Sequence, residues 1–299
     1  MSKRHFFGTA VVILLACGRL HGAEKLANIP YRDGGHVRQV LDIYRPEAKA
    51  PGGRPVVIWI HGGGWQGGDK SDVGVKPEIL TDRGFVFVAM NYRLLPEVRM
   101  DELIGDVAAA VGWVYRHIAE YGGDPSCIIV GGHSAGAQLA ALVCIDDRYL
   151  GGEQVPFTAL RGCVPVDGDT YDVPKIIMTG EHRLALYGEK MPTFGHRQKF
   201  GNDPQKHVDF SAVTHVAAGK AIPPFLILYF SGNPDTAAQA RRLESVVGGA
   251  GYRAKAVGNW KTNHDLLNTE LGHAGAPATP EFLKFVEACS RPATAEPPR

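Results

Sequence analysis

The chain alternates between short apolar runs and longer segments of mixed polarity. Runs rich in β-branched and aromatic residues predict strands near residues 37–45, 55–61, 85–91, 126–131, 162–167, 224–230 and 253–257. The segments between them predict helices near residues 73–83, 101–120, 135–145, 236–249 and 279–289. Strands that alternate with helices indicate an α/β fold with a mostly parallel central sheet and helices on both faces.

One segment, residues 172–219, breaks this alternation. It is rich in glycine, proline, histidine and charged residues, and it falls between two predicted core strands. An insertion at this place predicts a small cap over the site, and we expect it to influence the choice of substrate. The pattern of residues does not predict the shape of the cap.

The most informative motif is Gly132-His133-Ser134-Ala135-Gly136, a G-x-S-x-G sequence. It lies between a predicted buried strand and a predicted buried helix, so Ser134 is expected on a sharp strand-to-helix turn. The flanking glycines allow a strained backbone that lifts the hydroxyl out of the sheet. The helix behind it offers backbone N–H groups to a developing negative charge. Ser134 is therefore the predicted nucleophile.

A nucleophilic serine needs a base and an acid that orients the base. His264 is the predicted base because it follows the last predicted strand, and His273 is the alternative. Asp235 is the predicted acid because it ends the strand before that histidine, at the edge where an open α/β sheet places its site. Asp167 and Asp169, which follow an earlier strand, are the competing candidates.

A second glycine-rich motif, His61-Gly62-Gly63-Gly64-Trp65, follows the strand at 55–60. Consecutive glycines let the backbone turn its N–H groups toward a pocket without obstruction by side chains. We expect His61 and His133 to form local hydrogen bonds that hold the two loops. Three aromatic residues are predicted to line the pocket, with ordinary core packing as an equally weighted alternative: Trp65, Tyr92 and Tyr171.

These motifs resemble those of the α/β-hydrolase superfamily. Within it, the chain is similar to carboxylesterases related to hormone-sensitive lipase, above all to secreted bacterial feruloyl and acetylxylan esterases. The resemblance covers about residues 31–289 and rests on the two glycine-rich motifs and on residues 67–70, 91–94, 232–235 and 264. It implies that Ser134 is the nucleophile, Asp235 the acid and His264 the base. It also implies an oxyanion hole formed by the N–H groups of Gly63, Gly64 and Ala135. The chain departs from the family around the acid, where Ser231 and Thr236-Ala237 replace the usual neighbours.

The expected function is that of a serine carboxylic-ester hydrolase for short-chain acyl or aryl esters, among them feruloyl or acetyl esters of polysaccharides. This chemistry needs neither a cofactor nor a metal, and no cluster of Cys and His suggests a metal site. The alternatives are an arylformamidase-like amide hydrolase and a catalytically silent binding protein of the same fold. The net charge of +1 gives no electrostatic case for binding nucleic acid or an anionic membrane. The oligomeric state is not predicted.

The first 23 residues predict a signal peptide, with a basic start at Lys3-Arg4-His5 and an apolar run over 6–16 that is short for a bilayer span. The expected protein is exported to the periplasm or the medium without stable membrane insertion. Lipid anchoring through Cys17 is the alternative. One catalytic domain is predicted over 24–290 and a disordered tail over 291–299. Export permits disulfides, and the pairing state of the remaining cysteines stays open: Cys127, Cys144, Cys163 and Cys289.

Overall fold

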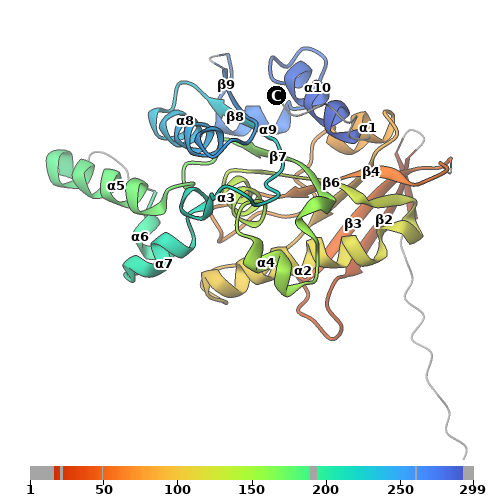
Figure 1. Ribbon diagram of the computed structural model, residues 1–299, viewed down its shortest axis with the longest axis horizontal. Helices are drawn as coiled ribbons and strands as arrows, with labels where there is room; N and C mark the ends of the chain where they lie inside the picture. The colour runs from red at the N-terminus through yellow and green to blue at the C-terminus, as the bar shows by residue number, and fades with distance from the viewer. Residues whose placement is uncertain (1–16, 21–22, 49, 189–193, 260, 292–299) are drawn as a thin grey trace, which may run out of the picture.

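The computed structural model describes residues 17–20, 23–48, 50–188, 194–259 and 261–291. In this part of the chain one sheet of nine strands forms the centre of the molecule, in the order β1-β2-β3-β5-β4-β6-β7-β8-β9 (Figure 1). The strands are β1 (Cys17–Leu20), β2 (Ala23–Pro30), β3 (Val40–Pro46), β4 (Arg54–Ile60), β5 (Val86–Met90), β6 (Gly123–His133), β7 (Leu160–Val166), β8 (Phe225–Phe230) and β9 (Ala254–Asn259).

The sheet is parallel from β5 through β9 and antiparallel at the β1–β3 edge. All of the predicted strands are present, and the expected α/β-hydrolase architecture is confirmed. The two strands that the sequence pattern missed, β1 and β2, lie at the edge. In β2 the buried positions fall on every third residue instead of every second one, and a register shift lies between Leu26 and Ile29. A strand of this kind lacks the continuous apolar run of a central parallel strand.

The helices cover both faces of the sheet. They are α1 (Lys76–Thr81), α2 (Met100–His117), α3 (Ala135–Val143), α4 (Asp147–Gly152), α5 (Val173–Tyr187), α6 (His196–Phe200), α7 (Pro204–Asp209), α8 (Pro234–Gly249), α9 (His264–Thr269) and α10 (Thr279–Ser290). Short 3₁₀ turns complete them: η1 (Ile118–Tyr121), η2 (Phe157–Ala159) and η4 (Ala212–His215). The five predicted helices correspond to α1, α2, α3, α8 and α10.

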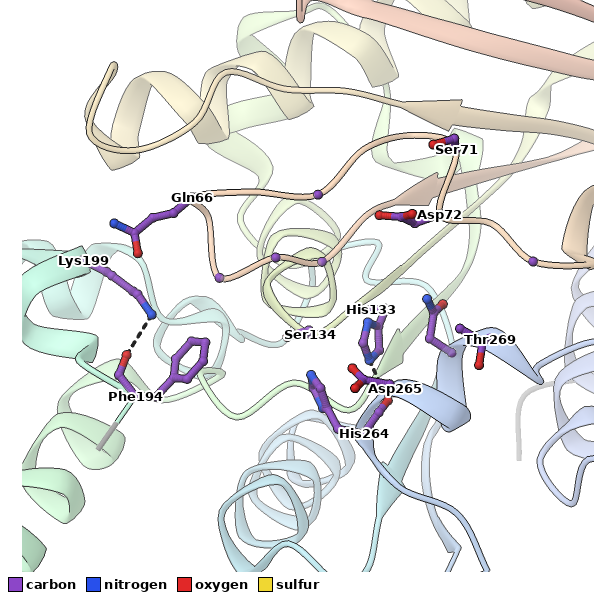
Figure 2. Close-up of a pocket in the computed structure, with 16 residues that line it drawn as sticks. Gln66, Ser71, Asp72, His133, Ser134, Phe194, Lys199, His264, Asp265 and Thr269 are labelled. Atoms are coloured by element: carbon purple, nitrogen blue, oxygen red, sulfur yellow. Dashed lines mark hydrogen bonds between the residues drawn. The ribbon is translucent and has the colours of Figure 1, made fainter. Parts of the chain in front are cut away.

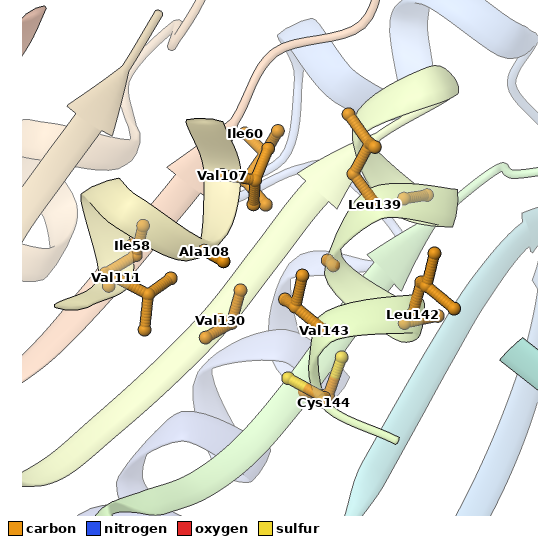
Figure 3. Close-up of a cluster of buried hydrophobic side chains, with 14 of the residues drawn as sticks. Ile58, Ile60, Val107, Ala108, Val111, Val130, Leu139, Leu142, Val143 and Cys144 are labelled. Atoms are coloured by element: carbon orange, nitrogen blue, oxygen red, sulfur yellow. The ribbon is translucent and has the colours of Figure 1, made fainter. Parts of the chain in front are cut away.

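Two hydrophobic cores lie on opposite faces of the sheet. In β4, Ile58 and Ile60 pack in the core beneath α2 and α3, while Val57 and Trp59 pack in the core with α1 and α10. Figure 3 shows the first of these cores, where side chains from α2 and α3 meet the strands β4 and β6. Because both faces are covered, the central strands are apolar at nearly every position, which is why their sequences form continuous hydrophobic runs.

The insertion at 172–219 contains α5, α6, α7 and η4, which lie together at one end of the molecule (Figure 1). Its start is tied to α8 of the main domain by Asp172, whose backbone N–H donates to Gln239 Oε1 at 2.8 Å. The Val173 N–H donates to Ser211 Oγ at 2.9 Å, which joins the start of α5 to the end of the insertion. The start of the insertion is therefore fixed both to α8 and to the segment that precedes η4.

The predicted signal peptide and tail fall largely outside the described residues. Of the first 23 residues, the structure describes only Cys17–Leu20, which pair with β2 in antiparallel fashion, and Ala23. Of the tail it describes only Arg291. Within the described residues, no helix is both long and apolar enough to cross a membrane. Cys127, Cys144, Cys163 and Cys289 are buried free thiols.

Helix α3 approaches β4 so closely that a side chain does not fit between them. A Cβ at Gly136 would lie 2.1 Å from the Ile60 carbonyl oxygen and 2.6 Å from that of His61. Both contacts are with backbone, which does not rotate away as a flexible side chain would. The glycine therefore sets the depth at which the helix seats on the sheet.

We expect Gly136→Ala to destabilise the protein by about 2 kcal/mol or more, because the helix must move off the strand. A matched control is Gly105→Ala in α2, where an added Cβ meets no atom within 4 Å. Alanine has the higher helix propensity, so this variant should gain about 0.5–1 kcal/mol. Urea unfolding followed by circular dichroism measures both changes. A Gly136→Ala variant as stable as the parent would contradict this account of the packing.

Candidate active site

Ser134 lies at the turn between β6 and α3, as predicted. Its φ of 55° and ψ of −118° are unusual for a residue with a side chain. Its N–H donates to the Val166 carbonyl at 2.8 Å, which fixes the turn against the neighbouring strand β7. Among the described residues, no group hydrogen-bonds the Ser134 hydroxyl. The strained turn presents this hydroxyl at the carboxyl end of the sheet.

His264 is held by Asp167. The Nδ1 atom of His264 lies 2.6 Å from Asp167 Oδ2, and the Asp167 side chain is fully buried. The other carboxylate oxygen, Oδ1, accepts a hydrogen bond from the Phe230 N–H at 2.6 Å. Asp167 follows β7 with a φ of 52°, and its own N–H donates to the Leu228 carbonyl at 2.7 Å. The carboxylate is thus fixed by two strands and directed at the imidazole.

The surroundings of His264 favour its protonated form. Burial lowers the pKa of His264, but the hydrogen bond and the negative charge of Asp167 outweigh this effect and leave the pKa above its ordinary value of 6.5. Burial lowers the pKa of the neighbouring His133 to about 3, so His133 is neutral near pH 7. Its Nε2 lies 3.0 Å from the His264 carbonyl oxygen, to which a neutral Nε2–H donates. The two histidines therefore have different roles. His264 bonds Asp167, whereas His133 holds the backbone of His264.

A buried lysine anchors the far end of α9, the helix that His264 begins. The Lys76 ammonium donates to the Asn268 carbonyl at 2.6 Å and to the Val73 carbonyl at 3.1 Å. It also lies 4.7 Å from the ring centroid of Trp59. Burial lowers the pKa of Lys76 to about 7. Both ends of this short helix are consequently tied to the main domain.

The prediction that Asp235 orients His264 is wrong. Asp235 lies in the first turn of α8, and its two carboxylate oxygens accept hydrogen bonds of 2.6 Å from the Arg183 guanidinium of α5. Asn233, rather than Asp235, caps that helix. The order of strands along the chain suggested Asp235, but the loop before α9 brings His264 to the end of β7. Arg183 belongs to the insertion, whose shape the sequence did not predict.

The other candidates also find different partners. Asp169 Oδ2 lies 3.2 Å from Nε2 of His196, in α6 of the insertion. His273 is absent from the residues that line the pocket, and its backbone N–H closes a turn with the Glu270 carbonyl. Of the acids that the sequence offered, Asp167 alone contacts His264 in the described structure.

The Gly62–Gly64 loop borders the same pocket as Ser134 and His264. Gly63 and Gly64 have positive φ angles of 109° and 59°. In the described structure, no protein acceptor pairs with the N–H groups of Gly63, Gly64 or Ala135. His61 stabilises the loop, since its Nδ1 lies 2.7 Å from the Gly62 carbonyl oxygen and its ring stacks on Tyr92 at 4.3 Å between centroids. The predicted donors in the Gly62–Gly64 loop and at the start of α3 are therefore unpaired, and the contacts of His61 hold the loop in place.

The three aromatic residues predicted to line the pocket are core residues instead. Trp65 is 1% exposed, and its indole N–H donates to Gln138 Oε1 at 3.1 Å. Tyr92 is buried and donates its hydroxyl to the His61 carbonyl at 3.0 Å. Tyr171 is also fully buried. The prediction of a binding role is wrong because none of these three side chains lines the pocket.

The pocket has a volume of about 850 Å³. Figure 2 shows Phe194, Lys199 and Gln66 on one side of Ser134, with His264, Asp265, Thr269 and Asp72 on the other. Phe194 and Lys199 come from the insertion, so it does contribute a wall to the site. The pattern of residues predicted neither, because it indicates no helix or strand within that segment. In the described part of the chain, no cluster of three or more His, Cys, Asp or Glu residues is arranged to hold a metal ion.

The protein is an α/β-hydrolase, as four features show together: the sheet order, the strained serine turn, the paired histidine and aspartate, and the unpaired N–H groups. A family model described as BD-FAE matches residues 41–244. The chain belongs to the BD-FAE family.

The chain is also similar to individual proteins. Esterase LipQ of Mycobacterium tuberculosis is 30% identical over 273 residues, which are 88% of this chain and 63% of that protein. Kynurenine formamidase of Salmo salar is 35% identical over 159 residues, 52% of this chain and 50% of that protein. The chain therefore spans less than two thirds of the length of these curated relatives. The crystal structure of esterase B from Lactobacillus rhamnosis aligns with 90% of this chain and 87% of the esterase chain, with a TM-score of 0.71 and 21% identity. The two proteins therefore share the fold.

We expect Asp167→Asn to lower the pKa of His264, because the carboxylate that favours the imidazolium is gone while burial remains. Asp235→Asn is the matched control, since its carboxylate pairs with Arg183. Nuclear magnetic resonance titration of the His264 ring protons measures the pKa directly. If Asp235→Asn moved it and Asp167→Asn did not, the pairing described here would be incorrect.

Proposed function

We propose that this protein is a serine carboxylic-ester hydrolase. The observation that carries the proposal is one pocket containing three components: the Ser134 hydroxyl on a strained turn, His264 bonded to a buried Asp167, and backbone N–H groups without partners. Nucleophilic acyl transfer needs these components. The esterase among the relatives, LipQ, supports the same activity.

In the proposed reaction, His264 Nε2 takes the Ser134 proton as the serine oxygen attacks the ester carbonyl. Asp167 holds the imidazole by Nδ1, so that Nε2 is free to accept the proton, and stabilises the imidazolium that forms. The N–H groups of Gly63, Gly64 and Ala135 stabilise the oxyanion, and the loss of one such donor costs about 3–4 kcal/mol in comparable sites. His264 then protonates the leaving alcohol, and water hydrolyses the acyl-enzyme.

The proposed substrates are short-chain acyl or aryl esters, among them feruloyl or acetyl esters of polysaccharides. The wall of the pocket supports a short acyl group, because a Cβ at Gly64 would lie only 3.1 Å from Phe194 Cζ. The second candidate is an arylformamidase activity, which the similarity to a kynurenine formamidase favours. Rates with p-nitrophenyl esters, methyl ferulate, acetylated xylan and formylkynurenine discriminate between these substrates. A preference for formylkynurenine over all the esters would favour the second candidate.

We further propose that the protein is exported, on the basic and apolar pattern of its first residues. The two processing routes leave different products. Cleavage after Ala23 removes strand β1, whereas lipid attachment at Cys17 retains it. The mass of the mature N-terminus after expression in a bacterial host with intact export identifies the route. An unprocessed protein in the cytoplasm would contradict export.

Replacement of Ser134 by alanine should lower kcat for p-nitrophenyl acetate by about 10³-fold or more, with the fold unchanged, because no acyl-enzyme can form. The parent should also be labelled by an organophosphonate, and the variant should not. Labelling distinguishes an active hydrolase from a silent member of the fold. Normal turnover by Ser134→Ala would refute the assignment of the nucleophile.

The value of kcat/KM should stop rising beyond butyryl esters, because the Phe194 ring closes the wall beside Gly64. Phe194→Ala should extend the optimum to longer chains, with a gain of up to about 0.8 kcal/mol for each methylene that becomes buried. Exposed Tyr187 of α5 offers a control at a position outside the pocket, as Tyr187→Ala. A parent enzyme whose kcat/KM increases steadily from butyrate to dodecanoate esters would contradict this prediction.

A further inference from the structure

The pocket has two chemically different sides, and the proposed reaction assigns a part of the substrate to each. His264 must donate its proton to the leaving oxygen, so the alcohol lies on the side of His264 and Asp265. The acyl group then extends to the other side of Ser134, toward Gln66, Phe194 and Lys199 (Figure 2). This assignment rests on the proposed function.

Among the described residues that line the pocket, Lys199 is the only lysine or arginine. The two histidines of the lining are titratable and are not counted here. It is half-buried, and its Nζ lies 3.4 Å from the ring centroid of Phe194. A Cβ at Gly64 would lie 3.5 Å from that Nζ, so the ammonium is next to the glycine loop. The Phe194 ring therefore holds the charge beside the glycine loop whose N–H groups form the proposed oxyanion hole.

The partners of this ammonium are neutral. Lys199 Nζ donates to the Phe194 carbonyl at 2.7 Å, and in the described residues no carboxylate forms an ion pair with it. The neighbouring acid, Asp169, is directed at His196 Nε2 at 3.2 Å. A lysine ammonium has three donors, so two remain for another acceptor. A structural lysine of this kind would be expected to have an anionic partner or to extend into solvent.

We propose that Lys199 makes the acyl side of the pocket a subsite for a negatively charged acyl group, that is, for esters in which a short acyl chain ends in a carboxylate. The two free N–H donors would bind that carboxylate, and Phe194 would pack against the short methylene chain. Because the space beside Gly64 is limited by the Phe194 ring, the chain between the two carbonyl carbons is short. A half-ester of a four-carbon dicarboxylic acid has the required charge and length.

The test compares ethyl hydrogen succinate with ethyl butyrate, two esters that differ in a carboxylate instead of a terminal methyl group. Ethanol release gives kcat/KM for each ester. The parent should prefer the succinate, and Lys199→Gln should reduce the ratio of the two kcat/KM values about tenfold, as expected for one hydrogen bond to a charged group. Lys199→Arg should keep most of the preference, and Lys199→Glu should reverse it. High salt should weaken the preference of the parent.

Lys206→Gln is the matched control. This lysine also belongs to the insertion and lies over a phenylalanine ring, 5.6 Å from the Phe210 centroid, but it does not line the catalytic pocket. Its substitution should leave the ratio unchanged. Equal effects of Lys199→Gln on both esters would overturn the proposal, since Lys199 would then act on the ester group that both share. The absence of any effect of Lys199→Gln on either ester would also overturn it. A parent that hydrolyses p-nitrophenyl acetate but neither ethyl ester would overturn the inference alone, whereas a parent inactive on all three esters would also refute the proposed esterase function.

Discussion

The arrangement of the site depends on one buried carboxylate. Asp167 has no contact with solvent, and its two oxygens meet the Phe230 N–H and the His264 ring. A buried charge is costly unless its hydrogen bonds are satisfied. Here the donors come from β8 and from the first residue of α9, so the carboxylate joins segments that are distant in sequence. Removal of either partner would leave one carboxylate oxygen unsatisfied, so this carboxylate ties the start of α9 to the ends of β7 and β8.

The rest of the molecule keeps this contact in place. Helix α9 is short, and it is fixed at its start by Asn263 and His133 and at its end by Lys76. The serine turn is fixed to β7 by the Ser134 N–H, and β7 also ends in Asp167. Ser134 and Asp167 therefore follow adjacent strands, β6 and β7, and His264, at the start of α9, bonds Asp167 and lines the same pocket as Ser134. Catalytic side chains commonly lie on connecting segments that a rigid sheet holds in position.

The insertion serves the site differently. Its helices add Phe194 and Lys199 to the wall of the pocket, and Arg183 of α5 neutralises Asp235. Phe194 and Lys199 thus set the shape and charge of this wall, whereas Arg183 and Asp235 are absent from the residues that line the pocket. The central sheet thus carries the proposed chemistry, while the inserted helices vary the surface that a substrate meets. This division agrees with the general finding that one fold supports many specificities through its connecting segments.

The sequence by itself determined the alternation of strands and helices, the serine turn, the glycine loop and the position of His264. The first three features depend on local patterns, namely apolar runs, glycines that permit positive φ, and a motif between a strand and a helix. His264 was identified by its place after the last strand. Only the tertiary structure decided that Asp167, and not Asp235, contacts His264. It also placed Trp65, Tyr92 and Tyr171 in the core and Lys199 in the pocket. Pairing between an acid and a base depends on which loops meet above the sheet, and the chain order of the strands does not specify that. The packing of an insertion likewise depends on contacts such as Arg183 with Asp235, which leave no periodic signal in the sequence.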